Sequence, residues 1–170
     1  MENNNQRVIR EYNTFLKATP ERVFPLLCPV REYAWLPHWR CEMLYSQSGF
    51  AEAGCVFATD FHNEYGRETW VVSHYEISSK IGFVRIGGKR TTRYEILLAM
   101  VNGGSEITWR QEITGLGVEG QSLVAGYTQE HFLNLMIPLN QMLDHYLQTG
   151  EMLHLNLLPV GSGTAGRDGT

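Results

Sequence analysis

The feature that most constrains the fold is a long amphipathic pattern over residues 121–147, which follows a succession of strand-like segments. At helical spacing its apolar side chains share one broad face: Val124, Tyr127, Phe132, Leu135, Leu139, Met142, Leu143 and Tyr146. The opposite face is polar: Gln129, Glu130, Asn140, Asp144 and Gln148. A long helix laid across a wide curved sheet touches the ends of the sheet better than its middle. The pattern therefore predicts an enclosed cavity, and a cavity suggests a ligand.

Composition excludes several classes of protein. The 170 residues suffice for one domain with a core, and 43% hydrophobic with 19% charged residues is typical of a globular protein. The net charge of −4 argues against nucleic acid as the main partner. The densest basic cluster is Lys89 and Arg90 with Arg93, which we expect to form a solvated turn.

Membrane and export signals are also lacking in the sequence. No run approaches the roughly 20 apolar residues that span a bilayer, so we expect no stable membrane insertion. The polar opening at residues 1–6 lacks the apolar core of a signal peptide. Cys28, Cys41 and Cys55 are an odd number of cysteines without framework spacing, and we interpret them as reduced thiols in a cytoplasmic protein.

The chain divides into one expected domain and two tails. Residues 1–6 are expected to be a disordered lead-in, and residues 159–170 a flexible Gly-rich tail. The segment 7–158 shows no linker and no internal repeat, which predicts a single domain.

The domain is expected to begin with a strand and two short helices. Val8–Lys17 has the pattern of a strand. Thr19 then offers a capping hydroxyl, Pro20 suits the first helical position, and Glu21 places an acid in the first turn. Val30–Leu36 is expected to form a second short turn or helix.

Six strands are then expected in quick succession: Cys41–Gln47, Cys55–His62, Glu68–Glu76, Ile81–Ile86, Thr91–Val101 and Ser105–Thr114. Alternation is clearest in the last two strands. There Tyr94, Ile96, Leu98 and Met100 share one face, as do Ile107, Trp109, Gln111 and Ile113. Arg110 and Glu112 lie on the opposite face, where we expect exposed ion pairs. The short connections predict antiparallel neighbours and an α+β fold.

The segment that joins the first expected strand to the first short helix reads Ala18-Thr19-Pro20-Glu21-Arg22-Val23-Phe24. It resembles the strand-to-helix opening of the SRPBCC superfamily, which includes START lipid-transfer domains, the birch-pollen allergen family, plant hormone receptors and polyketide cyclases. The following segments look like an uncharacterised bacterial branch: Leu27–Tyr33, Trp35–Glu42, Gly54–Phe57, Trp70–Glu76, Thr114–Leu116 and His145–Gly150. The resemblance extends from about Val8 to Leu153.

The resemblance implies a helix-grip fold. In this START-like fold a seven-stranded curved antiparallel sheet wraps around a long C-terminal helix, two short helices connect strands 1 and 2, and an internal cavity lies between sheet and helix. Because the superfold hosts binders, carriers and enzymes, the resemblance does not imply one activity. We expect neither a cofactor nor a metal.

The side chains expected to line the cavity and bind a ligand are mostly aromatic or apolar, with a few polar groups among them. They are Trp35, Trp39, Phe57, Thr59, Arg85, Tyr94, Trp109, Gln111, Tyr127, His131, Phe132, Leu135 and Met136. Plain core packing is the alternative for each one. Trp35 and Trp39 stand beside prolines and either gate the cavity mouth or cap the core. Arg85, if it faces inward, could hold a carboxylate or phosphate.

Catalytic and metal chemistry have weaker candidates. No catalytic set can be assigned, although Asp60, Glu76 and Arg85 could supply acid–base chemistry to a cyclase- or dehydratase-like enzyme. Cys28, His38, Cys41 and Cys55 supply four soft ligands, but their spacing matches no zinc motif. Pro138 inside the helical pattern predicts a kink, which either bends the helix around the sheet or lets its C-terminal half move.

The sequence therefore favours a module that binds, carries or senses a small hydrophobic or amphipathic molecule. A cyclase- or dehydratase-like enzyme using the same cavity is the alternative, and an interaction protein ranks last. The oligomeric state stays open, with a homodimer as one option.

Overall fold

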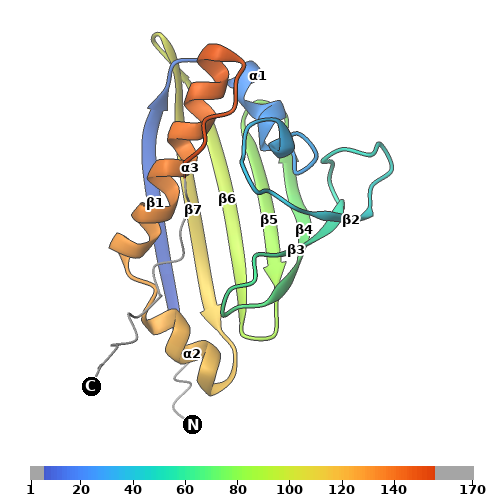
Figure 1. The fold of residues 1–170 in the computed structure, drawn as a ribbon, viewed down its shortest axis with the longest axis vertical. Coiled ribbons are helices and arrows are strands. Elements are labelled where there is room, and N and C mark those ends of the chain that lie inside the picture. The colour runs from blue at the N-terminus through green and yellow to red at the C-terminus, as the bar shows by residue number, and fades with distance from the viewer. Residues whose placement is uncertain (1–5, 156–170) are drawn as a thin grey trace, which may run out of the picture.

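Seven antiparallel strands form one curved sheet in the order β1-β7-β6-β5-β4-β3-β2 (Figure 1). The computed structural model describes residues 6–155, so the tail expected at 159–170 and residues 1–5 of the lead-in lie outside the described residues. The strands are β1 Arg7–Leu16, β2 Glu42–Tyr45, β3 Val56–Asp60, β4 Arg67–Glu76, β5 Lys80–Ile86, β6 Arg90–Val101 and β7 Gly104–Gly115. All seven correspond to the strands that the sequence predicts.

Helices occupy the inner face and one end of this sheet. They are α1 Pro20–Val23, the short 3-10 helices η1 Phe24–Leu27 and η2 Glu32–Ala34, α2 Gly117–Ala125, and α3 Gln129–Thr149. The long helix α3 runs along the sheet on the side of β1 and β7 (Figure 1). This arrangement is the expected helix-grip fold. Within residues 6–155, no helix is long and apolar enough to cross a membrane.

The single helix expected over residues 121–147 is wrong, because the chain forms two helices there. Two hydrogen bonds close α2: the N–H of Gly126 donates to the carbonyl of Ser122 at 3.3 Å, and the N–H of Tyr127 donates to the carbonyl of Val124 at 3.1 Å. Thr128 then starts α3, since its hydroxyl accepts a hydrogen bond of 3.1 Å from the backbone N–H of His131. Tyr127 therefore lies in the break between the helices instead of on a helix face.

The rest of α3 follows ordinary helix chemistry. The helix continues through Pro138 and ends at Gly150, whose φ of 73° is the left-handed conformation that glycine adopts easily. The N–H of Gly150 donates to the carbonyl of Tyr146 at 2.8 Å. The two interpretations of Pro138 stay predictions.

The alternation predicted for β6 and β7 is confirmed by their register. Tyr94 pairs with Gln111 and Ile96 pairs with Trp109, and all four side chains are buried on the inner face. Met100, at the far end of β6, is 59% exposed because the sheet runs past the core there. The inner face of these two strands thus forms the bottom of the space covered by α3.

The outer face carries polar side chains and ion pairs. Glu112 pairs with Arg7 of β1 at 2.7 Å, and Arg110 lies 4.0 Å from Glu11. Arg110 and Glu112 therefore lie on the outer face, as expected, but each pairs with β1 rather than with the other.

A candidate ligand cavity

A cavity of about 290 Å³ lies between the inner face of the sheet, α3, the η1–η2 segment and the loop between β3 and β4. Such a volume is close to the lower end, about 300 Å³, of the range typical for small-molecule sites. Aromatic side chains dominate its lining: Trp39, Phe57, Phe61, Tyr65, Trp70, Phe83, Tyr94, Trp109 and Tyr127. The polar lining residues are Glu32, Asn63, Glu64, Arg85, Arg90, Gln111 and His131.

Five aromatic rings, which we call the aromatic band, cross the inner face of the sheet with one ring from each of β3 to β7. Phe57 stacks on Trp70 with ring centroids 5.2 Å apart, and Phe83 meets Trp70 edge-on at 5.6 Å. Tyr94 lies 6.2 Å from Phe83 and 6.5 Å from Trp109. Such distances are typical of favourable aromatic pairs, so the band is a continuous apolar surface along the cavity.

The two indole N–H groups of the band are occupied by the protein itself. Trp70 donates to the hydroxyl of Thr59 at 2.8 Å, and Trp109 donates to the side-chain oxygen of Asn140 at 3.3 Å. A ligand therefore meets the apolar faces of these rings and competes with none of their hydrogen bonds.

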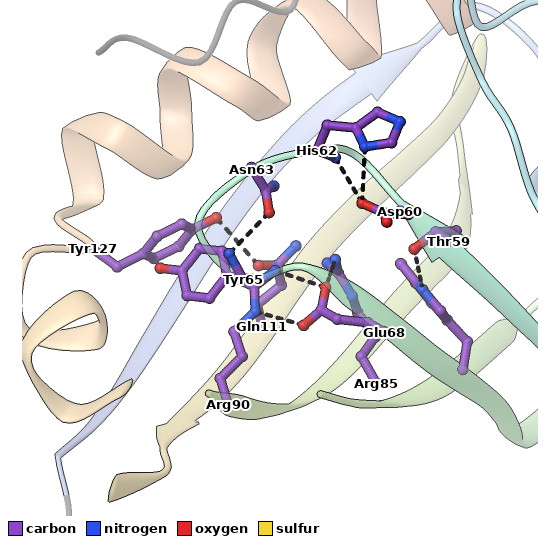
Figure 2. Close-up of polar contacts among 11 residues, drawn as sticks. Thr59, Asp60, His62, Asn63, Tyr65, Glu68, Arg85, Arg90, Gln111 and Tyr127 are labelled. Atoms are coloured by element: carbon purple, nitrogen blue, oxygen red, sulfur yellow. Dashed lines mark hydrogen bonds and ion pairs between the residues drawn. The ribbon is translucent and has the colours of Figure 1, made fainter. Parts of the chain in front are cut away.

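Glu68, Arg85 and Arg90, which we call the arginine cluster, lie beside the band. Figure 2 shows the contacts among these three charged side chains. Glu68 of β4 is 1% exposed, and its two carboxylate oxygens accept hydrogen bonds of 2.8 and 3.0 Å from Arg90. Arg85 of β5 also donates to Glu68. The expectation that Arg90 belongs to a solvated turn is wrong, because its side chain folds inward from the start of β6 and is buried.

Aromatic rings hold both guanidinium groups in place. The Arg85 guanidinium lies 4.0 Å from the ring of Trp70, and that of Arg90 lies 3.5 Å from the ring of Tyr65. Burial alone would raise the pKa of Glu68, but the hydrogen bonds and charges of Arg90 and Arg85 outweigh burial and hold that pKa below its usual range. Glu68 is therefore ionised at neutral pH.

Neutral hydrogen-bonding groups extend the polar end of the cavity. The Tyr127 hydroxyl donates to the side-chain oxygen of Gln111 at 3.4 Å (Figure 2). The His131 ring meets the Tyr127 ring edge-on, with ring centroids 4.9 Å apart. Burial raises the pKa of Tyr127 to about 12 and raises the pKa of Tyr94 further. Both phenols therefore stay protonated at neutral pH.

Glu32 of η2 also lines the cavity, although the sequence analysis did not single it out. Its side chain makes no ion pair or hydrogen bond with any side chain or backbone group of residues 6–155. Burial raises the pKa of this carboxyl to about 8, so Glu32 is mostly a neutral acid at pH 7. Besides burial, which acts most strongly, Glu32 raises the pKa of Tyr94 and Arg85 lowers it.

The structure brings ten of the thirteen expected ligand-binding residues into the lining: Trp39, Phe57, Arg85, Tyr94, Trp109, Gln111, Tyr127, His131, Leu135 and Met136. The other three lie in the packed core. Thr59 sits beside Trp70, Phe132 is fully buried, and the indole of Trp35 donates to the carbonyl of Leu26 at 2.9 Å. Of the two tryptophans considered as a gate, only Trp39 therefore reaches the cavity.

Two of the three residues named for the enzyme alternative lie elsewhere. Asp60 is exposed at the end of β3 and accepts a hydrogen bond from the backbone of His62 at 2.8 Å (Figure 2). Glu76 is exposed at the end of β4. Neither residue lines the cavity, so of the three candidates for acid–base chemistry only Arg85 does.

The cysteines and histidines do not form a metal site in the part of the chain that the structure describes. Cys28 and Cys55 are buried, Cys41 is half-buried, and none is in a disulfide within residues 6–155. Burial raises the pKa of the Cys41 and Cys55 thiols, which makes both poor nucleophiles at neutral pH.

Comparison with known proteins supports the fold alone. No family model and no curated protein matches the chain. A solved structure of an uncharacterised protein from Rhizobium leguminosarum is similar, with a TM-score of 0.60 and 13% identity over 85% of this chain and 96% of that one. Ara h 8.0201 has a TM-score of 0.60 and 12% identity over 84% of this chain and 99% of its own.

A third similar structure is that of DynU16, a protein of the dynemicin biosynthetic locus. Its TM-score is 0.55 with 19% identity, and the match covers 84% of this chain and 48% of DynU16. The TM-scores of the three structures show a shared helix-grip architecture. Because the sequence identities are low, the function must be argued from the cavity.

Proposed function

We propose that this protein binds a small hydrophobic or amphipathic molecule in the cavity between the sheet and α3. The observation that carries the proposal is the aromatic band, an apolar surface from five strands that α3 covers without filling the space. Polar groups lie at the sides of this surface, which is the usual composition of a small-molecule site.

The size of the cavity limits what it can hold. At about 30 Å³ per water molecule, 290 Å³ is the volume of roughly ten waters. Each 100 Å² of apolar ligand surface buried there contributes about 2.5 kcal/mol, before the entropy cost of binding is subtracted. A molecule with one or two rings, or a medium-length acyl chain, fits these limits better than a two-chain lipid.

Access to the cavity is expected beside the loop between β3 and β4. Phe61 and Glu64 of this loop line the cavity and are also exposed to solvent. The ring of Phe61 lies 5.8 Å from that of Trp39, so these two side chains flank the opening. Their displacement would widen it.

Membership in the SRPBCC superfamily is part of the same proposal. The segments from Ala18 to Phe24 and from Trp70 to Glu76 support it, together with the helix-grip architecture shared with the three structures above. The superfamily contains many binders of small apolar molecules, which agrees with the composition of the cavity.

The test is to fill the cavity and measure binding. Leu135 lines the cavity from α3, whereas Ile137 on the same helix is exposed. Leu135→Trp is expected to weaken the binding of naphthalene and decanol by at least about tenfold, since the new ring occupies their space. Ile137→Trp should bind both probes like the wild type. Equal affinities for all three proteins, measured by calorimetry, would contradict the proposal.

A second candidate function is acid catalysis, and Glu32 is the observation that favours it. A carboxyl with a pKa of about 8 in an apolar cavity can donate a proton near neutral pH. In a dehydration it would protonate the leaving hydroxyl of a β-hydroxy ketone while the α-proton is lost to water.

Diacetone alcohol is a small probe for this second candidate, since its dehydration gives an enone with strong ultraviolet absorbance. Glu32→Gln should abolish turnover while naphthalene still binds. Turnover that survives this substitution, or no turnover by the wild type, would rule out Glu32 as the acid for this reaction.

A further inference from the structure

The arginine cluster has an excess of positive charge. Among residues 6–155, two guanidinium groups share the single carboxylate of Glu68, which leaves one positive charge without a counter-charge in that part of the chain. The side chains of Arg85 and Arg90 are 9% and 5% exposed, so bulk water solvates this charge poorly. A buried charge without a counter-charge is costly, and a bound anion would lower that cost.

The excess charge is on the side of the cavity. Arg85 and Arg90 both contribute to the cavity lining, whereas Glu68 does not. The carboxylate therefore lies behind the guanidinium groups as seen from the cavity, and a ligand meets positive charge first. The faces of Trp70 and Tyr65 keep the two guanidinium planes in position.

The other ionisable groups of the lining do not neutralise the cluster. Glu32 is mostly protonated at pH 7, and Glu64 is exposed in the loop at the opening. The lining histidine, His131, lies against the ring of Tyr127 and can add only positive charge. The cavity is therefore net positive at neutral pH.

Hydrogen-bond donors remain for an anion. Each guanidinium has about five N–H donors, and Glu68 accepts one hydrogen bond from Arg85 and two from Arg90. Among the residues from 6 to 155, the buried Nε of Arg85 has no acceptor at all. Arginine binds carboxylates with paired hydrogen bonds, so the remaining edges suit such a group.

We propose that the ligand of this cavity is a monocarboxylic acid, whose carboxylate binds Arg85 and Arg90 while its apolar part lies on the aromatic band. The single excess charge matches a carboxylate better than a phosphate group, which carries about −1.5 to −2 at pH 7. This inference depends on the proposed binding function, because it assigns the chemistry of one end of the same ligand.

The experiment compares an acid with its neutral isostere. Calorimetry at pH 7 on the wild type is expected to show naphthoate binding at least about tenfold more tightly than naphthamide, the size typical of a charged hydrogen-bonded pair. Arg85→Met leaves the Glu68–Arg90 pair neutral, so the preference for the acid, taken as the ratio of the two affinities within the variant, should fall below about threefold. The matched control is Arg93→Met, which removes an exposed charge from the outer face.

The outcomes separate this inference from the proposed function. If the wild type binds naphthamide and naphthoate equally, the cavity binds ligands but the carboxylate site is refuted; this comparison needs no variant. If Arg85→Met keeps the full preference, the assignment to Arg85 is overturned. If naphthamide, naphthalene and decanol all fail to bind, the proposed function itself fails. A loss of preference in Arg93→Met would assign the effect to overall charge and refute the site.

Discussion

Two carboxylates on opposite faces of the same sheet are each shared by two cations. On the inner face, Glu68 pairs with Arg85 and Arg90. On the outer face, Glu95 of β6 pairs with Lys80 at 2.6 Å and with Arg93 at 3.1 Å. We call the second group the outer triad. The ratio of charges is the same, but the exposure differs. The side chain of Glu68 is 1% exposed and those of its cations are 9% and 5% exposed, whereas the side chain of Glu95 is 13% exposed and those of its cations are 24% and 62% exposed.

The comparison shows that burial, and not the pairing itself, decides whether the excess positive charge is solvated. Water and salt around the outer triad solvate its excess charge, so its pairs contribute at most about 1 kcal/mol. The inner cluster has no such solvent, and its excess charge acts on whatever enters the cavity. The same pattern of charges is thus a solvated surface feature on one face and, under the proposal above, the carboxylate site of the cavity on the other.

The largest expected difference between the two groups is in stability, when the carboxylate of Glu68 or of Glu95 is removed. Glu68→Gln should lower the free energy of unfolding by about 3–5 kcal/mol, because it leaves two buried guanidinium groups without a counter-charge. Glu95→Gln should lower it by less than about 1 kcal/mol. Urea denaturation followed by tryptophan fluorescence measures both. Similar losses in the two variants would mean that the faces do not differ as argued.

A second test uses Glu32, a carboxyl in the same cavity without a cation. Its pKa in the folded state, about 8, lies above the ordinary 4.5, so the folded protein binds more protons between these values. The contribution of Glu32 to stability is therefore full below pH 4.5 and is lost as the pH rises through 8. We expect this loss to be about 1–3 kcal/mol, less than the full shift would give, since the carboxyl touches cavity water.

The titration of Glu32 can be observed directly by carbon NMR of the glutamate carboxyl groups. One resonance with a midpoint near pH 8 should be present in the wild type and absent in Glu32→Gln. The same variant should lose the decrease in stability between pH 4.5 and 8. A midpoint for Glu32 near the ordinary value would show that water reaches the carboxyl freely.

The smallest expected difference is the effect of salt on how much each carboxylate, Glu68 or Glu95, contributes to stability. Raising sodium chloride from about 0.1 to 1 M shortens the Debye length from about 10 to 3 Å. The stability difference between wild type and Glu95→Gln should then shrink by a few tenths of a kcal/mol, because the outer triad is screened. The difference between wild type and Glu68→Gln should not change. Equal salt effects would place both groups in contact with solvent.

The sequence predicts the sheet well because alternation and turn chemistry are local signals. Ile107, Trp109 and Ile113 identify the inner face of β7 without any tertiary information, and Gly103 and Gly104 identify the turn before it. The break between α2 and α3 was also readable, since Gly126 and Thr128 are common end and start residues of helices. Helical periodicity continues across them and hides the break.

The polar groups of the cavity were harder to predict, for reasons that differ between residues. Glu68 shares the inner face of β4 with Trp70 and Val72, so an acid on an apolar face was a usable signal. Arg90 follows Gly87, Gly88 and Lys89 and resembles an ordinary turn residue. Its side chain is buried because it pairs with Glu68 and lies on the ring of Tyr65, and both contacts are tertiary. Glu32 lies in a segment without periodicity, and therefore its direction depends on tertiary packing alone.

The order of the strands has a consequence for how the chain reaches this state. From β2 to β7, strands that are consecutive along the chain pair with each other. The strand β1 instead pairs with β7, for example Phe15 with Glu106. Closing that loop of roughly 90 residues costs more entropy than closing any hairpin of the sheet. The hairpins are thus expected to form first, and pulsed hydrogen exchange should protect β6 before β1. The first strand to leave the ribosome is then the last to be placed, and the edge of β7 stays open until it arrives.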